Sequence, residues 1–279
     1  MREGRPASFY ILAAVFALFV LFLYGPTLTI FVLSFQGPQG GLTFPMNGVS
    51  LHWFKNLFEK QMVGDFAGSL QRSMILGVAV MLVTVAASFS AGLAFRNRFR
   101  GAAFVFYLAV ASLIVPSILV SLGIGLLFRV LGWDSAWYSS AFGAHLTWTL
   151  PFGLLIMFAV FNRFDRRYEE VARDLGATSW QTVRHVIVPI VLPSLIGVGL
   201  FGFTLSYDEF ARSLYTAGTF NTLPLEIYGM TTNVTTPVLY ALGTFTTGLS
   251  FLVIALALVS TIIVRRRRAR HGSDAGKAA

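Results

Sequence analysis

The segment that decides the fold is residues 170–176 (EVARDLG), which residues 186–189 (VIVP) follow ten positions later. This polar segment lies between two strongly apolar runs, residues 144–161 and 187–207. Apolar runs of about 20 residues are typical of helices that cross a lipid bilayer. We therefore expect the polar segment to form a short surface element that joins two spans.

The composition places most of the chain out of water. Of the 279 residues, 56% are hydrophobic and 12% are charged, with a mean hydropathy of +0.71, whereas a soluble domain has about 25% charged residues. The net charge of +9 could indicate nucleic-acid binding, but the basic residues cluster at the ends of apolar runs. We therefore expect a lipid bilayer and no nucleic acid as a partner. The chain has no cysteine, which excludes disulfides and thiolate metal sites.

Six apolar runs are long enough for a membrane helix. They comprise residues 9–33, 71–95, 102–128, 144–161, 187–207 and 241–264. The first is longer than the apolar core of a secretion signal, so we expect it to be retained. Pro116 and Pro151 fall within the third and fourth runs and predict kinks, which could serve packing or gating. With no repeat and no second domain, residues 1–279 are expected to form one transmembrane domain.

The basic residues predict the orientation of the chain. Sixteen of the 21 lysines and arginines lie in the termini and in the loops on one side of these six runs. Cytoplasmic loops carry this basic excess, so we expect both termini and the loop of residues 162–186 to be cytoplasmic. The tail of residues 265–279 begins with four arginines. Directly after a span, such a run indicates a stop and a lipid-headgroup anchor rather than a nucleic-acid patch.

The spans themselves carry no catalytic or ion-coupling chemistry. No run has a carboxylate, lysine or arginine at mid-membrane, and the chain has no phosphate loop and no His-x-x-x-His pair. These absences argue against an enzyme and against a proton-coupled carrier, while sodium coupling through backbone carbonyls stays open. Residues 197–202 fit the dinucleotide pattern Gly-x-Gly-x-x-Gly, but inside a span the small residues indicate close helix packing instead.

The loop of residues 162–186 predicts a helix-turn-helix knob. A first short helix over residues 168–175 would stop at Gly176, which suits a left-handed cap. Thr178 and Gln181 then fit a capping box that starts a second short helix, running to about Val188. Pro189 would begin the next span.

The charges of this knob suggest a partner. Glu169 and Arg173 have the spacing of a helical ion pair, whereas Glu170 and Asp174 repel each other at the same spacing and Arg166 offsets this only in part. The unpaired carboxylates could bind a basic groove on another protein, or they could form a solvated face.

The same residues carry a family resemblance. The pattern Glu-x-Ala-x-x-x-Gly, nine residues, then Val-x-Val-Pro resembles the EAA motif of ABC importer permeases of the binding-protein-dependent type. The chain departs from that motif at Val171, Val186 and Val188, all conservative apolar changes. Further stretches are similar to the spermidine/putrescine permease subunits, at residues 24–35, 98–101, 205–210 and 223–228.

This resemblance implies an all-α integral membrane protein of the bacterial inner membrane, with six transmembrane helices and a cytoplasmic helix-turn-helix coupling loop (the type I ABC importer permease fold). It implies a homologous second permease subunit, two ATPase subunits and an extracytoplasmic substrate-binding protein as partners. ATP and Mg²⁺ would bind to the ATPase, with no cofactor on this chain. The expected ATPase-coupling residues are Glu169, Glu170, Ala172, Asp174 and Gly176.

A substrate path is expected at the outer end of the fifth run. Polyamines are polycations, so carboxylates and aromatic rings would suit them, as found at Tyr207, Asp208, Glu209 and Phe210. These residues could equally be interfacial charges that cap a helix. The function expected is that of a permease subunit forming half of an alternating-access pathway for polyamines. The alternatives are a permease for iron, phosphonate or another small solute, or a self-sufficient secondary transporter or channel.

Overall fold

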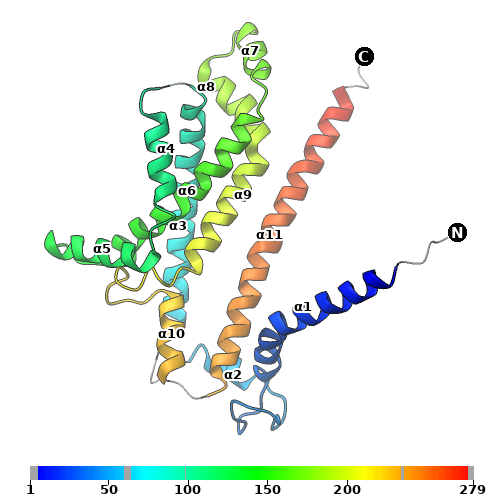
Figure 1. Cartoon of the computed structure of the whole chain (residues 1–279), viewed down its shortest axis with the longest axis vertical. Helices are drawn as coiled ribbons and strands as arrows, with labels where there is room; N and C mark the ends of the chain where they lie inside the picture. Colours follow the sequence, from blue (N-terminus) through cyan, green and yellow to red (C-terminus); the bar gives the residue numbers. More distant parts are fainter. Residues whose placement is uncertain (1–5, 60–63, 98, 234–235, 276–279) are drawn as a thin grey trace. The chain divides into compact units, whose positions relative to one another are not determined.

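The computed structural model describes residues 6–59, 64–97, 99–233 and 236–275, and within these ranges the ordered elements are helices apart from one isolated β-bridge. Figure 1 shows them in chain order. Their bounds are α1 Ala7–Leu33, α2 His52–Asn56, α3 Phe66–Phe95, α4 Ala102–Ala111, α5 Ser117–Val130, α6 Ser140–Asn162, α7 Arg167–Asp174, α8 Ser179–Thr182, the π-helical turn η1 Val183–Ile187, α9 Val188–Tyr207, α10 Leu223–Asn233 and α11 Val238–Ala275.

Five helical segments are long and apolar enough to cross a membrane. They span Ala7–Leu33, Phe66–Phe95, Ser140–Asn162, Ser179–Tyr207 and Val238–Ser260, with 23 to 30 residues each. At about 1.5 Å per residue, even 23 residues cover the roughly 30 Å of hydrocarbon. Five of the six expected runs are therefore helices of membrane-spanning length, and their bounds differ from the expected ones by several residues.

The third expected run is not one helix. Residues 102–128 divide into α4 and α5, of 10 and 14 residues, and Pro116 precedes α5 in a non-helical conformation with ψ of 128°. Proline cannot donate a hydrogen bond to the carbonyl one turn earlier, and it disfavours helical geometry in the residue before it. The expected kink is therefore a complete break. Pro151, by contrast, lies within an unbroken α6.

The chain divides into two compact units, which we describe separately. The first comprises the described parts of residues 1–66 and 227–249. Three phenylalanines, Phe58, Phe66 and Phe245, meet edge-to-face in it with ring centroids 5.4 to 5.6 Å apart, a geometry that aromatic rings favour. The Tyr240 hydroxyl donates a hydrogen bond of 2.6 Å to the Leu42 carbonyl. These contacts join the segment before α3 to the first turns of α11.

The second unit comprises residues 67–226 and the described part of 250–279. Small side chains let its helices approach closely. Thr84 on α3 and Thr149 on α6 share a hydrogen bond of 2.8 Å, and a Cβ on Gly202 of α9 would lie 3.4 Å from Thr84. Gly199 likewise faces Met81 and Val85. The Gly-x-Gly-x-x-Gly stretch therefore serves helix packing, as expected, rather than a nucleotide.

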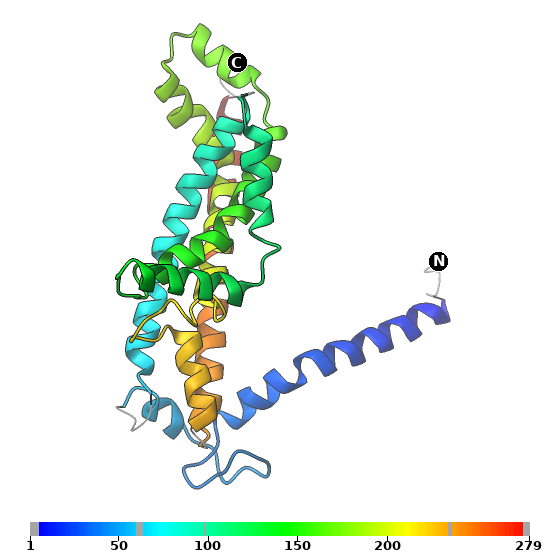
Figure 2. The same ribbon diagram turned by 60° about the vertical axis from the view of Figure 1, so that its left-hand side comes forward.

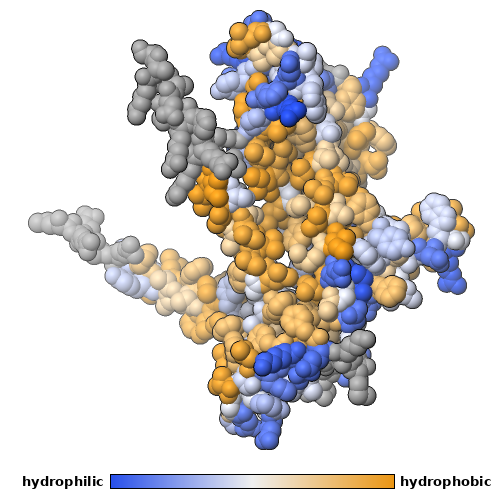
Figure 3. All heavy atoms as spheres, turned by 180° about the vertical axis from the view of Figure 1, so that it is seen from behind, coloured by the Kyte–Doolittle hydropathy of each residue, from blue (hydrophilic) through white to orange (hydrophobic). Residues whose placement is uncertain are grey.

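The arrangement of this unit places the knob. In Figures 1 and 2, α3, α4, α6 and α9 run side by side, α7 and α8 lie at one end of them, and α5 crosses them further along. Figure 3 shows apolar side chains along these helices and hydrophilic ones gathered at the end that contains α7 and α8. We call residues 167–182 the knob.

Candidate functional site

The turn between the two knob helices has the backbone chemistry expected from its sequence. Gly176 adopts a positive φ of 82°. Its N–H donates to the Arg173 carbonyl, and the Ala177 N–H donates to the Ala172 carbonyl, both at 2.9 Å. These two bonds define a Schellman motif, in which glycine is favoured because a side chain strains the left-handed conformation. The prediction of a left-handed cap at Gly176 is confirmed.

The second knob helix begins with the expected capping box. The Gln181 N–H donates to the Thr178 hydroxyl at 3.3 Å, and the Thr178 N–H donates to the Gln181 side-chain oxygen at 2.8 Å. Pro189 lies in the first turn of α9, as expected, but α8, η1 and α9 form one continuous helical segment, so no break separates the knob from this span. The π turn at Val183–Ile187 ends two residues before this proline, and the wider turn leaves room for a residue that has no N–H to donate. The knob is therefore continuous with a membrane-length helix.

The knob exposes large apolar side chains. Leu175 is 83% exposed and Trp180 is 70% exposed, and Tyr168 and Val171 are each 57% exposed. Tyr168, Val171 and Leu175 are spaced i, i+3 and i+7, so they share one face of α7. This apolar face was not predicted from the sequence, although the spacing of its residues indicates it. Exposed apolar clusters on an otherwise polar element are typical of protein-binding surfaces.

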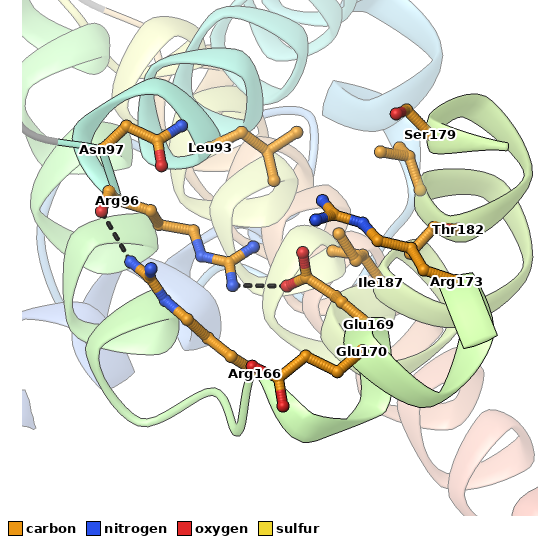
Figure 4. A pocket seen from close by; sticks show the side chains of 11 residues that line it. Leu93, Arg96, Asn97, Arg166, Glu169, Glu170, Arg173, Ser179, Thr182 and Ile187 are labelled. Atoms are coloured by element: carbon orange, nitrogen blue, oxygen red, sulfur yellow. Dashed lines mark hydrogen bonds and ion pairs between the residues drawn. The ribbon is translucent and has the colours of Figure 1, made fainter.

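The two neighbouring carboxylates of α7 have different surroundings. The expected pairing of Glu169 with Arg173 is not what the structure has, because Glu169 forms its ion pair with Arg96, directly after α3. Figure 4 shows the Arg96 guanidinium and the Glu169 carboxylate pointing toward each other beside a cavity of about 350 Å³. Glu170 and Asp174 are exposed, and neither has an ion pair among the described residues. The expected coupling residues thus divide into one internal carboxylate and two exposed ones.

The residues of the expected substrate path do not form one cluster. Tyr207 is buried and stacks on Phe203, with ring centroids 5.7 Å apart. Glu209 is half-buried, and its carboxylate accepts a hydrogen bond of 2.9 Å from the Arg212 N–H. Asp208 is exposed and Phe210 half-buried. Partial burial raises the pKa of the Asp208 and Glu209 carboxyls. For Glu209, the hydrogen bond from the Arg212 backbone and the charge of Arg212 counteract part of that rise in pKa.

Beside Glu209 lies a buried polar network that the sequence did not reveal. His145 at the start of α6 bonds to Ser206 at 2.8 Å through one ring nitrogen and to Ser213 at 2.9 Å through the other. His145 is only 1% exposed. Arg212 is fully buried, bonds to the Thr147 hydroxyl and lies 4.9 Å from the centre of the Trp148 ring. We call His145, Ser206, Arg212 and Ser213 the buried network.

A bundle of membrane-length apolar helices with a structured polar knob defines the class of the protein. The chain belongs to the family described as "Binding-protein-dependent transport system inner membrane component", which matches residues 83–270. It is thus a multi-pass protein of the inner membrane and a component of a transport system.

Individual relatives are similar over nearly the whole chain. The chain is 29% identical to the spermidine/putrescine transport system permease protein PotC of Haemophilus influenzae, covering 93% of this chain and 98% of that protein. Against PotC of Escherichia coli K12 the identity is 29%, with 91% and 93% covered. Against the putrescine transport system permease protein PotI of the same strain it is 27%, with 81% and 82% covered.

Solved structures share the fold. A chain of a bacterial ABC transporter involved in the import of the acidic polysaccharide alginate superposes with a TM-score of 0.63 at 17% identity, covering 96% of this chain and 99% of that one. A chain of the MetNI methionine ABC transporter superposes with a TM-score of 0.52 at 18% identity, covering 70% and 96%. The helical arrangement is therefore that of chains in ABC transporters.

Proposed function

We propose that this chain is the transmembrane permease subunit of an ATP-driven bacterial importer for polyamines, and that it forms half of the translocation pathway. The observation that carries the proposal is the knob, an ordered polar element with an exposed apolar face at one end of a membrane-length bundle. A surface of this kind needs a protein partner, and family membership implies a transport system of several components.

We propose six crossings, with the knob and both termini in the cytoplasm. Support comes from the path of the chain in the second unit. Helix α3 ends beside the knob, whereas α6 begins at the other end of the bundle, so α4 and α5 together carry the chain between the two ends. Helices α4 and α5 would together cross the membrane once, with a break between them at Pro116. The basic excess in the loops on the knob side supports this orientation.

The knob would be the docking element for an ATPase. Its exposed carboxylates, Glu170 and Asp174, would meet basic residues of that subunit, and its apolar face would enter an apolar groove. Ala172 and Gly176 would hold the turn in the shape that docks. ATP and Mg²⁺ would bind to two ATPase subunits and no cofactor to this chain, which performs no hydrolysis itself.

The transport cycle would be one of alternating access. ATP binding would close the ATPase dimer, and the knob would move with the surface that holds it. Because α8, η1 and α9 are one continuous helical segment, this movement would pass directly into a pore helix. A homologous second permease would form the other half of the pathway, and an extracytoplasmic binding protein would deliver the solute.

Polyamines are proposed as the solute because the relatives that match most of the chain are named for spermidine and putrescine. In the proposed path, the Asp208 carboxylate is exposed, whereas the Glu209 carboxylate already accepts a hydrogen bond from the Arg212 N–H. We expect Asp208→Asn to lower spermidine uptake about tenfold without changing complex assembly, since loss of one ion contact is worth about 1.5–3 kcal/mol. Asp134→Asn, at another exposed outer carboxylate, is the control. Equal uptake by the two variants would remove Asp208 from the path.

The proposed function is tested by reconstitution. The chain is purified with its sister permease, ATPase and binding protein and placed in liposomes with labelled spermidine. We expect uptake only with ATP and the binding protein. Uptake by this chain alone, driven by an ion gradient, would instead support a secondary carrier. ATP-driven uptake of iron or phosphonate but not spermidine would reject the polyamine assignment.

A further inference from the structure

The side chain of Arg96, at the end of α3, contacts residues of both α6 and α7. It follows the last residue of α3, and its guanidinium forms an ion pair with Glu169 in the first turn of α7. The two side chains are only 10% and 14% exposed, so solvent screens this pair far less than a surface pair. The ion pair connects the end of α3 directly to the knob.

Two further sets of contacts fix the position of Arg96. Its guanidinium lies 5.3 Å from the centre of the Phe161 ring and 5.1 Å from that of the Phe164 ring, near the end of α6. Cations are attracted to aromatic faces at these distances. The Arg166 guanidinium donates a hydrogen bond of 2.6 Å to the Arg96 carbonyl (Figure 4). Side chain and backbone of Arg96 are thus both held by the segment that leads into the knob.

The helices below Arg96 are tightly packed. A Cβ on Gly92 of α3 would lie 2.7 Å from the Phe161 ring, so the two helices are in close contact there. Met157, Phe161 and Ile187 form a buried cluster from α6 and η1, and Phe89 and Leu93 of α3 pack against it. Such an interface resists sliding and moves as a body.

Helix α3 has no short covalent route to the knob. Residues 163–166 join the knob to α6, and η1 joins it to α9. In contrast, α3 reaches it through non-covalent contacts, namely the packing of Phe89 and Leu93 on the buried cluster and the contacts of Arg96. We propose that Arg96 is a positioning residue that transmits movement of the knob to α3 through Glu169. The two neighbouring carboxylates then have separate roles. Glu169 pairs with Arg96 within the chain, and Glu170 faces the ATPase. This inference rests on the proposed function of the knob.

The test is a double-substitution cycle in the complete reconstituted importer. The variants are Arg96→Gln, Glu169→Gln and the two combined, with Arg163→Gln as an exposed arginine control. We expect each single change to lower ATP-driven uptake about tenfold, within the range of typical coupling between sites. Because both act through one ion pair, the combined variant should also lose about tenfold, not about a hundredfold. Arg96→Lys keeps the charge and should retain most of the uptake.

A second readout separates transmission from docking or folding. Arg96→Gln should retain the ATPase in the purified complex and keep ATP hydrolysis near its basal rate while uptake falls. Multiplicative losses in the combined variant, loss of the ATPase from the Arg96→Gln complex, or uptake equal to that of the control would each overturn the inference. None of these results would affect docking through Glu170. If the unsubstituted chain never retains an ATPase, the proposed function itself fails.

Discussion

The knob and the buried network, near the two ends of α6, differ in how far their polar groups are exposed. In the buried network, His145, Arg212 and Ser213 are at most 1% exposed, and the partners of both His145 ring nitrogens lie within the chain. In the knob, Glu169 and the capping residues Thr178 and Gln181 have such partners, while the apolar face and the carboxylates of Glu170 and Asp174 are exposed. The comparison teaches that one polar region is enclosed by the fold, whereas the other presents its groups on the surface that we propose as a docking site.

The largest effect that separates the two regions is expected for Arg212→Ala. This change removes a buried cation from the Thr147 hydroxyl and the Trp148 ring. Truncating a large buried side chain to alanine leaves a cavity and costs about 2–5 kcal/mol. Thermal unfolding in detergent should therefore occur many degrees lower. Arg173→Ala, at an exposed knob arginine, should unfold like the unsubstituted chain. Equal stability of the two variants would contradict the structural role of the buried network.

A smaller effect, on binding rather than stability, is expected for Trp180→Ala. Its ring is 70% exposed, so unfolding should shift by no more than about 0.5 kcal/mol. At an interface, aromatic hot spots contribute about 2 kcal/mol or more, so the affinity for the ATPase should fall about thirtyfold. Trp133→Ala is the matched control, since Trp133 is 60% exposed but lies outside the knob. If both variants bind the ATPase equally, the apolar face is not the docking surface.

The smallest effect is expected for Thr178→Ala, which removes the hydroxyl that caps α8. Loss of such a cap costs about 1 kcal/mol. Because α8 carries Trp180, the ATPase affinity should fall about fivefold through poorer ordering of the knob. Thr178→Ser keeps the capping oxygen and should bind normally. A loss in the serine variant as large as in the alanine variant would show that the cap is not responsible.

The sequence predicts what depends on neighbouring residues. The left-handed cap at Gly176 and the capping box of Thr178 and Gln181 form as expected, because their hydrogen bonds reach at most five residues along the chain. The long apolar runs likewise become helices. The family resemblance, carried by the EAA motif and several shorter stretches, agrees with the family that the chain belongs to.

Interactions between distant segments escape this kind of reasoning. Glu169 pairs with Arg96, 73 residues away, rather than with the local Arg173. Arg212 gives no sign of burial in the sequence, because Thr147 lies 65 residues earlier and Trp148 next to it. The effect of a proline on a helix is equally hard to predict from the sequence, since Pro116 separates two helices whereas Pro151 lies inside one. Tertiary packing decides these outcomes.

The central claim, that the knob docks on an ATPase, has one direct test. The chain has no cysteine, so Leu175→Cys offers a single thiol for a maleimide that carries a photoreactive group. The labelled chain is reassembled with its partners in liposomes and illuminated. We predict a covalent adduct with the ATPase subunit, and none when the label is placed at Trp133→Cys. An adduct with the extracytoplasmic binding protein, or none with the ATPase, would contradict the account.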